Sequence, residues 1–177
     1  MIPFAYLAIG IRVLIALCTR TIFQPDEYFQ ALEPAHHAVF GYGHLTWEWV
    51  APKPIRSILY PFLNMPIFWI LKSTGLAETV SLILVLKIAS PKILHGLLAA
   101  GTDIYLVETT RRTLGSAYVG TAFLLSLTSF FNALALSRSL SNSLETTLTT
   151  IAFAHYPWDA SPSLSPQLIF NRHASNP

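Results

Sequence analysis

Two adjacent carboxylates, Asp26 and Glu27, follow Pro25 directly after the first apolar segment of the chain. If that segment lies in a bilayer, the two acids stand at a membrane boundary, where acidic side chains are costly and usually functional. A carboxylate in such a place can serve as a general base, because partial burial favours its protonated form near neutral pH. The alternative is an ordinary helix start, with Pro25 in the first turn and both acids favourable at the helix N-terminus.

The segment that follows keeps this polar and aromatic character as far as Ser57. It carries two further acids, three histidines and two tryptophans between apolar segments. Long irregular segments are usually functional or disordered, and the aromatic content argues against disorder. We therefore expect residues 20–56 to form one functional loop. Its candidate site residues, besides the two acids above, are Glu33, His36, His37, Trp47, Glu48 and Arg56.

A second polar cluster lies between two apolar segments near the end of the chain. Here Ser141 or Asn142 suits a helix N-cap, and Glu145 fits the position that a capping box requires. Arg138 suits the end of the preceding helix. Arg138, Asn142 and Glu145 are also candidates for a binding site, and the two interpretations are compatible.

Composition indicates a membrane protein, since 53% of the residues are hydrophobic, 11% are charged and the mean hydropathy is positive. The net charge of +2 is small and dispersed, which argues against a nucleic-acid partner. Apolar runs of bilayer length without strand alternation predict an all-α, polytopic fold with about four crossings. These crossings are expected within residues 1–19, 76–107, 115–136 and 140–158. Residues 58–71 are shorter and carry two prolines, which favours an interfacial or re-entrant helix.

Arginines determine the expected topology. Arg111 and Arg112 indicate a cytosolic loop, because short cytosolic loops collect basic residues. One crossing between that loop and residues 20–56 then makes residues 20–56 a large lumenal first loop, with Asn142 on the same face. Arg12 lies in the middle of the first crossing, so it must face protein or a water-filled cavity, or else extend toward an interface.

The motifs of residues 21–49 resemble the first lumenal loop of the dolichyl-phosphate-mannose-dependent mannosyltransferases, which are of the GT-C type. The matching residues are Gln-Pro-Asp-Glu-Tyr-Phe-Gln at 24–30, His36-His37 and Thr-Trp-Glu-Trp at 46–49, with Arg56-Ser57 beyond them. Residues 138–151 are similar to the family's second recognisable motif. Within the family, the ordered set is most similar to the branch that adds the third, α-1,2-linked mannose to the GPI-anchor precursor.

The resemblance implies a multi-pass enzyme of the endoplasmic reticulum membrane with GT-C-like amino-terminal helices. Its partners would be membrane lipid, dolichyl-phosphate-mannose as donor and the GPI precursor as acceptor, with no cofactor and no metal. Asp26 matches the position of the family's catalytic base, and Glu27 would orient Asp26 or the acceptor. Candidates for the donor phosphate and for stacking on sugar are Arg56, Arg138, His36, His37, Trp47 and Trp49.

Enzymes of this family are several hundred residues long, so we expect this chain to be an amino-terminal portion. Residues 1–158 would belong to the membrane domain and residues 159–177 to a disordered Ser/Pro-rich tail. The alternatives are a non-enzymatic membrane subunit, a transporter fragment with Arg12, Lys92 and Asp103 along its pathway, or a related mannosyltransferase acting on dolichol-linked oligosaccharide. A metal site is disfavoured, because adjacent histidines on a helix point in different directions and no HExxH spacing occurs.

Overall fold

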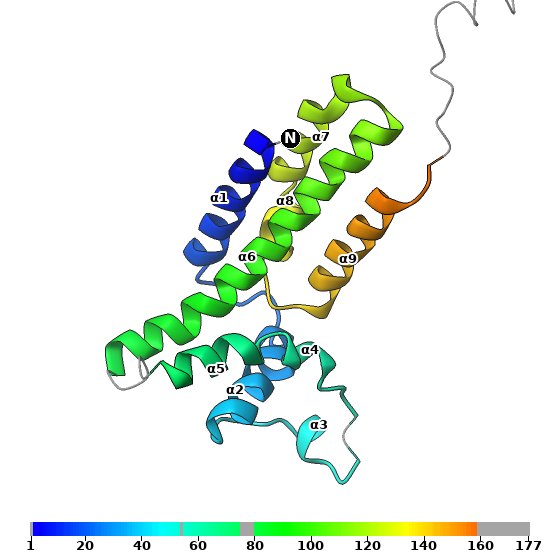
Figure 1. Ribbon diagram of the computed structural model, residues 1–177. Helices are drawn as coiled ribbons and strands as arrows, with labels where there is room; N and C mark the ends of the chain where they lie inside the picture. Colours follow the sequence, from blue (N-terminus) through cyan, green and yellow to red (C-terminus); the bar gives the residue numbers. More distant parts are fainter. Residues whose placement is uncertain (1, 54, 75–79, 159–177) are drawn as a thin grey trace, which may run out of the picture.

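The structure is a computed structural model that describes residues 2–53, 55–74 and 80–158. All regular elements in these ranges are helical, which confirms the predicted all-α class. Figure 1 shows two layers, a bundle of longer helices and a group of short helices at one end of it. The predicted disordered tail, residues 159–177, lies outside the described residues.

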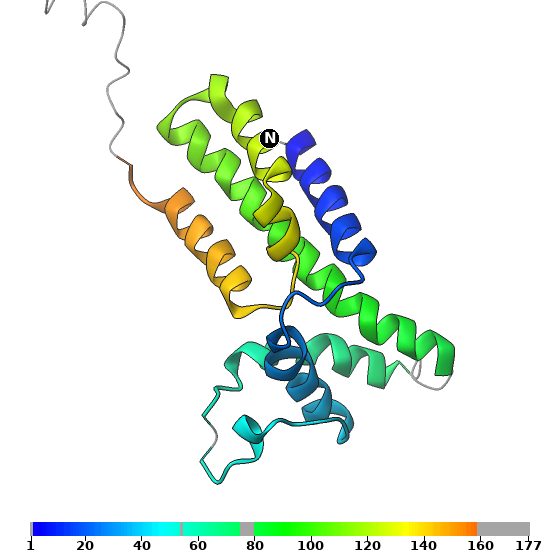
Figure 2. The same ribbon diagram turned by 180° about the vertical axis from the view of Figure 1, so that it is seen from behind.

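The centre of the bundle is a single helix, α6 (Val80–Thr113), which covers most of the segment 76–107 where a crossing was expected. Helix α1 packs along one side of α6 and α9 along the other, while α7 and α8 lie behind α6 in Figure 1 and in front of it in Figure 2. The turn η2 joins α6 to α7. The bounds of these elements are Ile2–Cys18 for α1, Ser116–Tyr118 for η2, Val119–Thr128 for α7, Phe130–Ala135 for α8 and Ser141–His155 for α9.

Helices α1 and α6 lie close together because the residues between them are small. Ala8 of α1 and Ala100 of α6 are fully buried in the same hydrophobic cluster. At Gly96 the two backbones approach so closely that a Cβ atom would lie 2.9 Å from the Cα of Val13. Small side chains at a helix contact are what permit such an approach.

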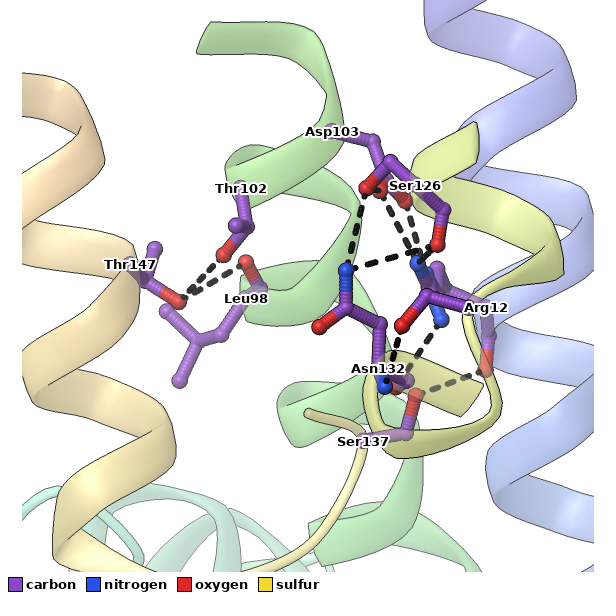
Figure 3. A network of polar contacts seen from close by, with 9 residues as sticks. Arg12, Leu98, Thr102, Asp103, Ser126, Asn132, Ser137 and Thr147 are labelled. Carbon is purple, nitrogen blue, oxygen red and sulfur yellow. Dashed lines mark hydrogen bonds and ion pairs between the residues drawn. The ribbon is translucent and has the colours of Figure 1, made fainter. Parts of the chain in front are cut away.

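A buried ion pair also joins these two helices. The Nε of Arg12 lies 2.7 Å from Oδ2 of Asp103, and Nη2 lies 2.9 Å from Oδ1, with both side chains fully buried. The hydroxyl of Ser126 also donates to Asp103, at 2.6 Å (Figure 3). A buried charge is tolerated when it is paired and hydrogen-bonded, as it is here. Arg12 was predicted to face protein or a water-filled cavity, or to extend toward an interface, and it faces protein.

The crossing predicted over residues 115–136 is wrong as a single helix. The segment begins at Gly115, whose positive φ (97°) is not helical, and Ser129 interrupts it with a ψ of 117°. The Ser129 hydroxyl then accepts a hydrogen bond from the N–H of Asn132, which starts α8. Arg12 of α1 donates hydrogen bonds to the carbonyl groups of Ser126 and Asn132 (Figure 3). Backbone carbonyls on both sides of the break therefore have a side-chain partner.

Among the described residues, no helix combines the length and the apolar character that crossing a bilayer requires. The four predicted crossings are thus not found as helices of that kind. Residues 58–71, predicted to be interfacial or re-entrant, form part of two short helices, α4 (Leu59–Phe62) and α5 (Met65–Ser73).

The predicted loop of residues 20–56 contains three helical elements. These are the π-helix η1 (Glu27–Leu32), α2 (Glu33–Phe40) and α3 (Trp47–Val50). Together with α4 and α5 they form the short-helix layer, which lies against the first half of α6 (Figure 1). Residues from the two layers therefore meet at this end of the bundle.

Candidate active site

Glu27 is the first residue of the π-helix η1, and its carboxylate binds backbone N–H groups of the preceding residues. The residue is buried, and its Oε1 accepts hydrogen bonds from the N–H groups of Phe23, at 2.8 Å, and Gln24, at 3.2 Å. The wider helical turn is closed by the N–H of Glu33, which donates to the carbonyl of Tyr28. π-Helical turns are rare and often occur at functional sites.

Arg138 binds Glu27 from the other end of the sequence. Its Nη1 lies 3.1 Å and 3.3 Å from the two carboxylate oxygens of Glu27. The same guanidinium donates to the carbonyl and the hydroxyl of Thr21, and its Nε donates to the carbonyl of Leu134 in α8. The predicted role of Arg138 at a helix end is thus confirmed, and the two polar clusters of the sequence meet in a buried ion pair.

Asp26, which precedes Glu27, has a different environment. It is exposed, its backbone is already helical (φ −59°, ψ −28°), and its side chain makes no capping hydrogen bond. Within the part of the chain that the structure describes, the Asp26 carboxylate has neither a hydrogen-bond nor an ion-pair partner, whereas donors engage both oxygens of Glu27. The carboxylate of Asp26 is therefore the one that is free to accept a proton.

A cavity of about 360 Å³ lies where the short-helix layer meets α1, α6 and the segment after α8. Its lining combines two carboxylates with three cationic side chains: Glu27, Glu33, Lys87, Lys92 and Arg138. Aromatic and imidazole side chains complete much of the wall, among them Tyr28, His36, Tyr42, His44, Phe68 and His95. Sites of this size with a few convergent polar groups are the usual form of a small-molecule binding site.

His36 connects the short helices to α6 across the cavity. Its Nδ1 lies 3.1 Å from the carbonyl oxygen of Tyr42, and its Nε2 lies 3.2 Å from Nζ of Lys87. Because an ammonium group can only donate, Nε2 accepts and the proton of the neutral ring resides on Nδ1. Burial, and then the positive charge of Lys87, lower the pKa of His36, which favours this neutral form. His37, its neighbour, is not among the cavity-lining residues, as the divergence of adjacent helical side chains predicts.

Glu33 also lies in the cavity wall, and its Oε2 accepts a hydrogen bond from the N–H of His44. Gly43 passes directly over this carboxylate, since a Cβ atom there would lie 2.9 Å from Oε2. Its φ of 129° is also one that other residues rarely adopt. Glu33 thus fixes the segment that closes one side of the cavity.

Asp26 lies outside the cavity lining, and so do the other predicted site residues Trp47, Glu48, Trp49, Arg56, Asn142 and Glu145. Glu48 and Arg56 form a surface ion pair at 3.2 Å, and Trp47 is exposed. Asn142 and Glu145 are exposed on α9. The predicted caps at Ser141 or Asn142 are wrong, because the N-cap is Leu140 and makes no side-chain hydrogen bond.

Reasoning from the sequence missed the cavity face of α6. Lys92 donates to the carbonyl of Thr19 at 2.7 Å, and Nε2 of His95 lies 3.1 Å from Oδ1 of Asn64. The lining residues of α6 recur at positions 87, 88, 91, 92 and 95, the spacing of one helix face. This periodicity in the sequence was the signal that could have identified the cavity face of α6.

Of the three charged residues named in the transporter alternative, only Lys92 lines the cavity, because Arg12 and Asp103 bind each other elsewhere.

Comparison with known proteins gives a family match over most of the chain. The model of the Alg9-like mannosyltransferase family matches residues 4–174. The chain is 41% identical over 148 residues to GPI mannosyltransferase 3 of Yarrowia lipolytica, covering 84% of this chain and 28% of the relative. It is 36% identical over 157 residues to GPI alpha-1,2-mannosyltransferase 3 of Homo sapiens, covering 89% and 27%. It is 34% identical over 149 residues to mannosyltransferase APTG1 of Arabidopsis thaliana, covering 84% and 26%.

The chain spans about a quarter of the length of these relatives. No solved structure matches it. The family resemblance predicted from the loop motifs is confirmed by the matches to GPI mannosyltransferase 3. The chain belongs to the Alg9-like mannosyltransferase family.

Proposed function

We propose that this chain carries the catalytic base of a mannosyltransferase that moves mannose from dolichyl-phosphate-mannose to the GPI-anchor precursor, as its third, α-1,2-linked mannose. Homology to GPI mannosyltransferase 3 supports the reaction class. The observation that carries the assignment is the free carboxylate of Asp26 directly before Glu27, whose own carboxylate is held by Arg138. One acid is available for chemistry, and the other fixes its position.

The reaction needs a base for the acceptor and stabilisation of a leaving phosphate. The oxygen of an acceptor hydroxyl attacks C1 of the mannose, and the bond between C1 and the phosphate oxygen breaks. Its electron pair leaves with dolichyl phosphate, and the hydroxyl proton passes to Asp26. A positioned general base contributes about 10²–10⁴ in rate. Glu27 does not take this proton, because backbone N–H groups and Arg138 engage its oxygens.

We further propose that the protein acts in the endoplasmic reticulum membrane, with Asp26 on the lumenal side and Arg111 and Arg112 on the cytosolic side. The arginines end α6, whereas the short-helix layer packs near its beginning, so the two lie at opposite ends of the bundle (Figure 1). Large apolar side chains are exposed on the bundle, including Phe130 (81%) and Phe131 (66%) of α8. Such side chains suit contact with lipid.

The test is complementation of cells that cannot add the third GPI mannose. The protein to express is a chimera in which this chain replaces the matching segment of the Yarrowia lipolytica relative. The chimera is expected to restore GPI-anchored proteins at the cell surface. The proposal is contradicted if the chimera reaches the endoplasmic reticulum at the level of the Yarrowia enzyme and yet adds no mannose to the precursor.

A further inference from the structure

The cavity has more positive than negative charge to offer a ligand. Glu27 and Arg138 neutralise each other in their buried ion pair. This leaves the carboxylate of Glu33 against the ammonium groups of Lys87 and Lys92, all three in the lining. In residues 2–53, 55–74 and 80–158, neither lysine has a carboxylate within ion-pair distance. The wall formed by α6 therefore has an unneutralised cationic surface.

The neighbours of Lys87 and Lys92 are neutral acceptors. Lys87 donates to Nε2 of His36 and, at 2.8 Å, to the hydroxyl of Tyr42. Lys92 donates to the backbone carbonyl of Thr19. An ammonium group has three N–H donors, so Lys92 keeps two that this contact does not use. Lys87 keeps one, and its Nζ also lies over the ring of Phe40, 3.8 Å from the centroid. Both lysines are thus fixed in place while still able to bind an anion.

A buried hydroxyl without a partner lies in the same cavity wall. Ser139 is 6% exposed, and its Oγ atom has no hydrogen-bond partner in the described part of the chain. The buried hydroxyl of Tyr60 is a neighbour of the Ser139 hydroxyl, but among the described residues the two do not reach the geometry of a full hydrogen bond. Such groups usually find a partner in a folded protein, because an unsatisfied buried hydroxyl is costly. A ligand rich in acceptor oxygens would provide one.

We propose that Lys87 and Lys92, together with the Ser139 hydroxyl, bind the phosphate group of the lipid-linked sugar donor. This rests on the proposed function and assigns the phosphate to α6 instead of the arginines expected from the sequence. Arg138 is occupied by Glu27, and Arg56 binds Glu48 outside the cavity lining. A phosphodiester is an anion that only accepts hydrogen bonds, so it matches this wall. The two lysines also stabilise the charge that grows on the phosphate as the C1–O bond breaks.

The test measures donor use and product binding in the chimera described above. Lys92→Gln is the decisive variant, because Lys92 contacts neither His36 nor Tyr42 and its loss does not loosen that segment. Hydrogen bonds to charged groups correspond to about 10- to 100-fold in binding. Lys92→Gln and Lys87→Gln are each expected to raise the KM for dolichyl-phosphate-mannose, and to weaken the binding of dolichyl phosphate, by such a factor. Lys92→Arg, which keeps the charge, is expected to retain most of the affinity.

Lys72→Gln is the matched control. Lys72 also donates to a backbone carbonyl, that of Val39 at 2.6 Å, but it is exposed and does not line the cavity. If Lys87→Gln and Lys92→Gln have the donor KM and the dolichyl-phosphate affinity of this control, the phosphate assignment is wrong. A chimera that transfers no mannose contradicts the proposed function instead. Dolichyl-phosphate affinity, measured on the same purified variants, then still decides whether these lysines bind the phosphate.

Discussion

At the scale of single residues, the two adjacent acids have different environments. Glu27 is buried and bound by Arg138 and two backbone N–H groups, so it holds the start of η1 in place. Asp26, at the adjacent position, is exposed and has no side-chain partner among the residues that the structure describes. Substitution of the two acids should therefore produce two different defects, one in stability and one in chemistry.

Glu27→Gln should strongly lower thermal stability. The change leaves the guanidinium group of Arg138 buried without its counter-charge, and removing one partner of a buried pair typically costs about 3–5 kcal/mol. The matched control is Glu48→Gln, which breaks a pair whose arginine side chain is 44% exposed and should cost less than about 1 kcal/mol. Melting temperatures in detergent measure both. Equal shifts for the two variants would contradict the structural role of Glu27.

Acidification should weaken the contact between the layers through His36. Burial and the charge of Lys87 lower its pKa from the usual 6.5, so the folded state binds the proton less readily than the unfolded state. The stability contributed by neutral His36 is complete above pH 6.5 and is lost as the pH falls from there through the folded pKa. The melting temperature should fall in that range more steeply for the wild type than for His36→Gln. Parallel pH profiles would overturn this expectation.

The residues of the site were only partly predictable from the sequence. The loop motifs predicted Glu27, Glu33 and His36, because local spacing in the loop carries the resemblance. The partner of Glu27 lies 111 residues away, and no local spacing predicts such a pairing. Lys87 was not among the predicted site residues, and Lys92 was named only in the transporter alternative, since a charge in an apolar run does not reveal which cavity it lines.

At the scale of the elements, the break between α7 and α8 directs the chain toward the cavity, where Arg138 lies. Arg12 donates to the carbonyls of Ser126 and Asn132 on either side of Ser129, and Asp103 holds Arg12 in position (Figure 3). After α8 the chain reaches Arg138 within a few residues. The buried pair of α1 and α6 thus supports the site from within the bundle.

Arg12→Met should destabilise the fold by about 3–5 kcal/mol, because it leaves the carboxylate of Asp103 buried without its partner. The double variant Arg12→Met with Asp103→Leu removes both charges and should recover a large part of this loss. Recovery should be incomplete, since the carbonyls at the helix break still lose their donor. Chemical unfolding in detergent measures the two variants. A double variant less stable than Arg12→Met would contradict this account of the pair.

The sequence predicted the helices of the bundle better than their interruptions. Residues 1–19 were expected to form one helix, and α1 spans Ile2–Cys18. Residues 115–136 were expected to form another, but the backbone turns at Ser129. Hydropathy could not predict this break, because it depends on the donors that Arg12 supplies from another helix.

At the scale of the whole molecule, the two ends of the helix bundle are chemically distinct. One end holds the cavity with Glu27 and Arg138. At the other, Glu108 binds Arg111 and Arg112, whose hydrogen bonds lower the pKa of Glu108 to about 2. This cluster stays ionised at any physiological pH. It therefore keeps positive charge at the end that we propose to be cytosolic.

Glycosylation acceptor sites test this orientation directly. A site inserted after His44, in the exposed part of the loop, should be modified, and one inserted after Arg112 should not. The assay is the shift in gel mobility that is reversed by a glycosidase. Modification of the second site without the first would invert the proposed topology.

The central claim is that Asp26 takes the acceptor proton. Asp26→Asn keeps the size of the side chain but removes its basicity, and Asp26→Glu restores a carboxylate as the control. In the chimera, the single-turnover rate of mannose transfer from dolichyl-phosphate-mannose should fall by about 10²–10⁴ in Asp26→Asn and recover in part in Asp26→Glu. Both variants should keep the melting temperature of the parent, because Asp26 makes no structural hydrogen bond in the described residues. An Asp26→Asn chimera that transfers mannose at the parental rate would show that Asp26 is only the residue that precedes a helix.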